Sequence, residues 1–204
     1  IIRWTDRGKL PGISFKKGAF TGESNGAIII AGGISESKIH SSITVLEKDN
    51  EGQYEVYSGF ELDHPTAFGT SVVAEEGLLC IGGRNNVQCY ADVVLLVWNS
   101  TEKKIEKKIL AKLPEPRAYS AAAIIDNVVY VAGGIKSLNN VQALKDFWSL
   151  DLSQTTAQWE VLDQCPGPGR VLSVGAVQYD GFYSIFHLIS GLEIRRSENQ
   201  PPVT

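Results

Sequence analysis

Four apolar, β-forming runs in this 204-residue chain each end in a pair of small residues. The pairs are Gly32-Gly33, Gly82-Gly83, Gly133-Gly134 and Ser190-Gly191, and their first members are 50, 51 and 57 residues apart. A repeat of about 50 residues indicates one structural unit used several times along the chain. Because one such unit cannot bury its apolar face alone, the units are expected to stack against one another.

A turn signal lies in front of each small pair, between two short apolar segments. The turns are expected at Asn25-Gly26, Glu76-Gly77, Asp126-Asn127 and Asp180-Gly181. Asn-Gly and Asp-Gly favour tight hairpins, because both central positions tolerate a positive φ. The sequence therefore predicts a β-hairpin whose second strand ends at the small pair.

Two further strands follow each of the first three pairs, after a polar loop. The third strands are expected at 43–46, 93–97 and 147–150. The fourth strands share a column of aromatic or aliphatic residues, namely Trp4, Tyr54, Ile105 and Trp159. Each unit thus predicts one four-stranded antiparallel sheet.

An aromatic residue after an alanine marks the start of the first strand in three units. These residues are Phe20, Phe68 and Tyr119. A Gly-Gly pair at the end of a strand, repeated at this period, is typical of kelch-type β-propeller blades. The predicted fold class is therefore all-β, a kelch-type β-propeller with four-stranded antiparallel blades.

The strands predict one propeller domain over residues 1–204, with the following parts. A fourth strand of an earlier blade lies at 1–6, complete blades at about 14–58, 67–109 and 118–163, a partial blade at 171–191, and a polar tail at 192–204. Because propellers protect their sheet edges by closing into a ring, we expect an incomplete part of a six-bladed ring. A functional four-bladed mini-propeller and a β-sandwich with chance spacing are the alternatives.

Composition excludes several classes of function. The net charge is −4 and no Lys/Arg cluster could neutralise a row of phosphates, which argues against a nucleic-acid partner. No apolar run reaches the length of a membrane span. The three cysteines and three histidines lack metal-ligand spacing, so no metal site is predicted. Cys80, inside a strand, is expected to be a small buried hydrophobe.

The stretch from Gly18 to Gly33, GAFTGESNGAIIIAGG, resembles a blade of bacterial sialic acid mutarotases, also called N-acetylneuraminate epimerases. Trp4 and Leu10-Pro11-Gly12 match the strand that precedes that blade. The segment 67–83 resembles the last blade of that family, and 113–134 resembles its first or second. Because late blades come first here, the chain is similar to the cyclically permuted mutarotase subfamily.

The resemblance implies an isomerase that interconverts the α and β anomers of N-acetylneuraminic acid or a related acidic sugar. The sugar ring opens and closes by acid/base catalysis, which needs no cofactor. The resemblance also implies a catalytic Glu followed six residues later by Arg, expected beyond Thr204. The cluster of Glu193, Arg195 and Arg196 has a different spacing. A periplasmic or secreted location is expected, and the oligomeric state stays open.

Substrate-binding residues are expected at the axial mouth of the propeller, where first strands begin and Gly-Gly pairs end. The candidates are Arg117, Arg84, Arg170, Phe20 and Tyr119. Arginine suits a sugar carboxylate because it donates two parallel hydrogen bonds. For Arg117 the alternative is hydrogen bonding between blades, and Thr66 stands where the resemblance implies an arginine.

The alternative function is a non-catalytic kelch-repeat module that binds a protein or a glycan. Propeller folds host unrelated functions, so the fold alone does not choose between the two.

Overall fold

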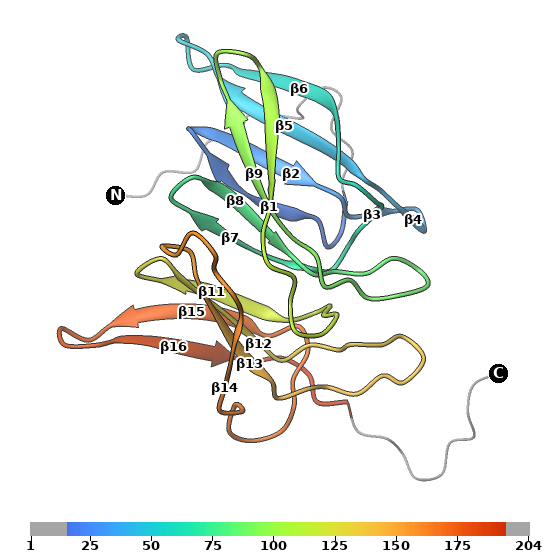
Figure 1. Ribbon diagram of the computed structural model, residues 1–204. Helices are drawn as coiled ribbons and strands as arrows, with labels where there is room; N and C mark the ends of the chain where they lie inside the picture. Colours follow the sequence, from blue (N-terminus) through green and yellow to red (C-terminus); the bar gives the residue numbers. More distant parts are fainter. Residues whose placement is uncertain (1–15, 195–204) are drawn as a thin grey trace.

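The computed structural model describes residues 16–194 (Figure 1). These residues form strands and loops, and no helix occurs among them. Three four-stranded antiparallel sheets and the two-stranded sheet β15-β16 follow one another in chain order, and a second two-stranded sheet, β3-β4, lies within the first repeat. The all-β fold with four-stranded antiparallel blades is therefore confirmed. The strand predicted at 1–6, including Trp4, and the tail from residue 195 onward lie outside the described residues.

Each blade runs through its strands in chain order, from the first strand to the last. Blade 1 (20–61) consists of β1 (Phe20–Ser24), β2 (Ala27–Ala31), β5 (Ser42–Lys48) and β6 (Tyr54–Glu61). Blade 2 (70–109) consists of β7 (Thr70–Ala74), β8 (Gly77–Ile81), β9 (Val93–Asn99) and β10 (Lys104–Ile109). Blade 3 (121–162) consists of β11 (Ala121–Ile125), β12 (Val128–Ala132), β13 (Phe147–Asp151) and β14 (Glu160–Leu162).

Blade 4 (174–189) has two strands among the described residues, β15 (Val174–Tyr179) and β16 (Ser184–Ile189). A small hairpin of β3 (Ile34–Ser35) and β4 (Lys38–Ile39) fills the loop after the first Gly-Gly pair. The sequence pattern did not predict this hairpin.

Two of the four predicted hairpin turns have the expected geometry. Asn25-Gly26 and Asp126-Asn127 connect their strands with positive φ at both positions. In blade 2, pairing of Ala74 with Gly77 moves the turn to Glu75-Glu76, so the predicted turn is wrong by one residue. In blade 4 the turn spans 180–183, where the Asp180 carboxylate accepts two backbone N–H bonds.

The hydrophobic core lies between the blades. β8 shows this best, because all five of its residues are buried. Leu78 and Cys80 pack against blade 1, whereas Leu79 and Ile81 face blade 3. Burial raises the pKa of the Cys80 thiol, and its place in the core confirms the predicted role of a small hydrophobe.

The first strand of each blade lies innermost, with β1, β7, β11 and β15 side by side. The residue two positions before each of these strands takes part in a chain of backbone hydrogen bonds around the axis. The bonds run from Phe68 N to Gly18 O (2.7 Å), from Tyr119 N to Phe68 O (2.8 Å) and from Leu172 N to Tyr119 O (3.0 Å). All four residues have φ between 57° and 61°.

This register corrects the aromatic column predicted from the sequence. Gly18, and not Phe20, is the equivalent of Phe68 and Tyr119. Phe20 opens β1 as Thr70 opens β7. The absence of a side chain at Gly18 leaves room for the Phe68 ring, because a Cβ on Gly18 would lie 2.5 Å from that ring.

The Gly-Gly pairs form a backbone seam between successive blades. The second glycine of each pair donates its N–H to a carbonyl of the next blade: Gly33 to Thr66 (2.8 Å), Gly83 to Arg117 (2.7 Å) and Gly134 to Arg170 (2.8 Å). At the first glycine of each pair, a Cβ would lie 2.2 to 2.6 Å from the same carbonyl oxygens. Both glycines of each pair have a positive φ. The pairs are therefore required by the architecture.

We predict that Gly82→Ala destabilises the protein far more than Gly26→Ala. Both glycines have a positive φ, but a Cβ at Gly82 would lie 2.2 Å from Arg117 O, whereas nothing lies within 4 Å at Gly26. Backbone strain alone costs about 1 to 2 kcal/mol. Gly82→Ala should cost about 3 kcal/mol or more, since the seam must also open. Urea unfolding of both variants measures the difference, and equal losses would contradict the seam.

Candidate functional site

Arg84 occupies the inner end of blade 2, directly after the Gly82-Gly83 pair. Its guanidinium lies 5.0 Å from the ring centroid of Phe68 and 5.6 Å from that of Tyr119. Its Nε donates to the Tyr119 hydroxyl (2.7 Å) and its Nη1 to the Asn85 carbonyl (2.9 Å). The two rings contact each other with centroids 4.9 Å apart. Arg84, Phe68 and Tyr119 thus form one half-buried group, named here the mouth cluster.

The backbone around Arg84 is held on both sides. Arg84 N donates to Ala67 O (2.8 Å), and Arg84 also pairs with Cys89 across a short loop. Within that loop the Asn85 side chain accepts the N–H groups of Val87 and Gln88. The guanidinium is therefore positioned before any ligand arrives, which reduces the entropic cost of binding.

Arg117 lies inside its own blade and not at the mouth. Its side chain has 0% exposure. Nη1 donates to Gly133 O (3.2 Å) and to Asp146 Oδ2 (2.9 Å), and the guanidinium lies 4.1 Å from the Trp148 ring centroid. Burial lowers the pKa of Arg117, although Asp146 opposes this effect. The blade-to-blade contact of Arg117 comes from its backbone carbonyl rather than from its side chain.

Arg170 and Phe20 also point away from the mouth cluster. Arg170 Nη1 donates to Ser190 O (2.9 Å), which repeats the contact of Arg117 with Gly133. Phe20 is 3% exposed and packs in the core between blades 1 and 2. Of the five predicted binding residues, the structure brings together Arg84 and Tyr119. It adds Phe68, which its shared column with Tyr119 could have indicated.

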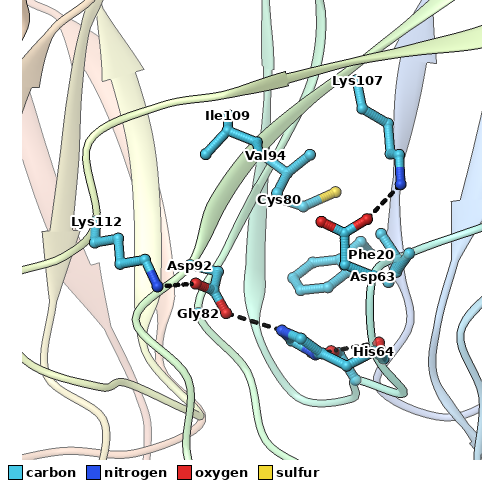
Figure 2. Close-up of a pocket in the computed structure, with 12 residues that line it drawn as sticks. Phe20, Asp63, His64, Cys80, Gly82, Asp92, Val94, Lys107, Ile109 and Lys112 are labelled. Carbon is cyan, nitrogen blue, oxygen red and sulfur yellow. Dashed lines mark hydrogen bonds and ion pairs between the residues drawn. The ribbon is translucent and has the colours of Figure 1, made fainter.

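An open cavity of about 230 Å³ lies between blades 1 and 2 (Figure 2). His64 spans one side of it, contacting Thr66 Oγ1 and Asp92 Oδ2 at 2.8 Å each and stacking on Tyr90. Lys112 Nζ lies 2.9 Å from the other oxygen of Asp92. Burial acts to raise the pKa of Asp92, but Lys112 and His64 outweigh it and lower the pKa.

The rest of this inter-blade cavity is mainly apolar, apart from an Asp63–Lys107 ion pair. Its remaining lining residues are Phe20, Leu62, Cys80, Gly82, Val94 and Ile109. Among residues 16–194, no group of three His, Cys, Asp or Glu side chains suits a metal ion. No helix in that range is long and apolar enough to cross a membrane.

Comparison with known proteins identifies the class of this fold. The Kelch motif matches residues 116–166, which include all of blade 3. The structure of YjhT superimposes with a TM-score of 0.63 at 14% sequence identity, covering 87% of this chain and 65% of YjhT. Together with the four-stranded sheets, these likenesses show a kelch-type β-propeller fold.

In sequence, the chain is similar to Beta-scruin of Limulus polyphemus. The two are 23% identical over 209 residues, which cover 98% of this chain and 22% of Beta-scruin. The chain therefore spans about a fifth of the length of this curated relative.

Arg117 and Arg170 occupy equivalent positions, but only Arg117 is buried, so the two should differ in their effect on stability. Arg117→Ala leaves Asp146 without this partner and uncovers Trp148. Because Asp146 is 26% exposed, the loss should lie near the lower end for a buried pair, at about 3 kcal/mol. Arg170→Ala removes a more exposed hydrogen bond to Ser190, at a cost of about 1 kcal/mol. Chemical denaturation measures both. A small loss for Arg117→Ala would show that this residue is not structural.

Proposed function

We propose that this chain is a sugar mutarotase, which interconverts the α and β anomers of N-acetylneuraminic acid or a related acidic sugar. The observation that carries the proposal is the mouth cluster, a positioned guanidinium at the inner end of the blades. The resemblance of residues 18–33 to sialic acid mutarotases supports the substrate class.

Arg84 is proposed to bind the sugar carboxylate. Guanidinium has five N–H donors in a planar fork, and Arg84 gives two of its nitrogens to Tyr119 and Asn85. The remaining N–H groups can pair with a carboxylate in the bidentate geometry that favours arginine over lysine. The Phe68 and Tyr119 rings flank the guanidinium and offer flat apolar surface to the sugar ring.

The reaction needs one group that takes the proton of the anomeric hydroxyl and another that protonates the ring oxygen. The Tyr119 hydroxyl accepts the Arg84 Nε–H, so its own proton remains available to a ligand oxygen. We propose that Tyr119 orients the sugar through this proton. The Glu/Arg pair implied by the resemblance is not assigned to any residue in 16–194. The proposed periplasmic or secreted location rests on the same resemblance.

The second candidate is a non-catalytic kelch-repeat module that binds a glycan or protein through the mouth cluster. This reading is favoured by the engagement of Arg117 and Arg170 inside their blades, which leaves Arg84 as the arginine of the predicted set that faces a ligand. Binding through Arg84 requires no acid/base pair.

We expect the protein to accelerate the exchange of α- and β-N-acetylneuraminate, measured by NMR exchange spectroscopy. Arg84→Gln should raise KM about tenfold or more, because the charge-assisted bonds to the carboxylate are lost. Arg170→Gln is the matched control and should leave KM unchanged, since its side chain donates to Ser190 O.

The outcomes separate the two candidates. Exchange at its spontaneous rate, with sugar binding that depends on Arg84, would favour the non-catalytic module. Spontaneous exchange without any binding would overturn the proposal for this sugar.

A further inference from the structure

The inter-blade cavity lies where other blades hold an arginine side chain. Aligning the blades on the seam places Thr66, Arg117 and Arg170 in one column, because each carbonyl accepts the N–H of the preceding Gly-Gly pair. In blades 3 and 4 the arginine donates to the carbonyl of the first residue of that blade's small pair. Arg117 donates to Gly133 O and Arg170 to Ser190 O. Thr66 is too short to reach the equivalent carbonyl of Gly82.

A second substitution enlarges the same space. In blade 3, Trp148 lies against the Arg117 guanidinium. Asp146 and Asp92 are equivalent, because their carbonyls accept the N–H groups of Gly133 and Gly82. Trp148 is the second residue after Asp146, and Val94 is the second residue after Asp92, so Val94 takes the position of Trp148. Blade 2 therefore lacks both the guanidinium and the indole. The two hydrogen-bond acceptors of the arginine are still present in blade 2. Gly82 and Asp92, the equivalents of Gly133 and Asp146, both line the cavity.

We propose that this cavity binds a guanidinium group from outside the chain, in the place that Arg117 fills in blade 3. The guanidinium donates to the Gly82 carbonyl and to the Asp92 carboxylate, as Arg117 does to Gly133 and Asp146. An aromatic wall is also present, because Phe20 enters from β1 of the neighbouring blade (Figure 2). The ligand is a small guanidinium compound or an arginine side chain of a partner.

The size of the cavity suits such a ligand. A dry apolar cavity of about 150 Å³ holds benzene, and this one measures about 230 Å³. Guanidinium fills the polar end at Gly82 and Asp92. A short alkyl chain can lie along the apolar wall of Leu62, Val94 and Ile109.

The charges around Asp92 allow a cation to enter. His64 holds one carboxylate oxygen and Lys112 the other. The Lys112 side chain is 70% exposed, and an ion pair this exposed contributes little, so a ligand can displace it. Asp63 and Lys107 form a separate pair at the rim and neutralise each other.

The test compares butylguanidinium with butylammonium at equal ionic strength, followed by amide chemical shifts in ¹H–¹⁵N NMR spectra. Butylguanidinium should shift Gly82, Asp92 and Val94 saturably and bind about tenfold more tightly, since only its planar fork can pair with both acceptors. Equal affinities, or no saturable shift with either compound, would overturn the proposal.

Variants locate the binding site. Asp92→Asn should weaken butylguanidinium binding about tenfold, and Lys112→Gln should strengthen it by removing the competing cation. The double variant Thr66→Arg/Val94→Trp rebuilds the arrangement of blade 3 and should abolish binding while raising Tm. Arg84→Gln is the control and should change nothing here. Unchanged binding in a folded Thr66→Arg/Val94→Trp protein would contradict the proposal.

Peptide ligands distinguish the two possible sources of the guanidinium group, a partner protein or a small compound. A capped Gly-Arg-Gly peptide that binds more tightly than butylguanidinium indicates an arginine of a partner protein. The reverse order indicates a small guanidinium compound. The matching Gly-Lys-Gly peptide should bind about tenfold more weakly than its arginine counterpart.

Discussion

The hydrogen bond from the second glycine of each pair to a carbonyl of the next blade sets the geometry of the whole assembly. At Gly83 this bond reaches Arg117 O, and the missing Cβ of Gly82 lets that carbonyl approach. The bond joins backbone to backbone, so it is independent of the side chain that each blade carries there. One residue, Arg117, therefore serves two blades: its carbonyl holds the preceding one, and its side chain holds its own.

The residues that form the axial chain of backbone hydrogen bonds share an unusual backbone conformation. Phe68, Tyr119 and Leu172 all have φ near 58°, which is costly for residues with a side chain. A single such outlier would point to a functional site. Here the same φ recurs in every blade, with Gly18 in the first, so the strain belongs to the blade architecture. Function then arises from the side chains placed on this common frame.

Both candidate sites come from differences between repeats that share one backbone. The mouth cluster exists because two neighbouring blades carry aromatic residues at the axial position and Arg84 follows one Gly-Gly pair. The inter-blade cavity exists because Thr66 and Val94 replace the arginine and tryptophan of blade 3. Alignment of the sequence with itself exposes the Thr66 difference, whereas the space that it leaves depends on packing between blades.

Strand periodicity and the Gly-Gly pairs were enough to predict the blades, because both are local properties of the chain. Residues 16–194 contain three four-stranded blades and a two-stranded fourth. The errors are errors of register. An aromatic after an alanine looks alike at Phe20 and Phe68, and only the axial hydrogen bonds show that Gly18 is the equivalent residue. Likewise, Glu76-Gly77 resembles a turn, yet strand pairing places the turn at Glu75-Glu76.

The sequence by itself determined the fold class and the four-stranded make-up of the blades, since both follow from spacing along the chain. The tertiary structure decided which of the predicted arginines are held within their own blades. Arg84, Arg117 and Arg170 all lie near Gly-Gly pairs in sequence or across the seam. The Arg117 and Arg170 side chains point into their own blades, whereas Arg84 lies between aromatic rings of two blades. The direction of each side chain depends on partners 16 to 35 residues away in the chain, such as Gly133 for Arg117 and Tyr119 for Arg84, and no local pattern encodes these contacts.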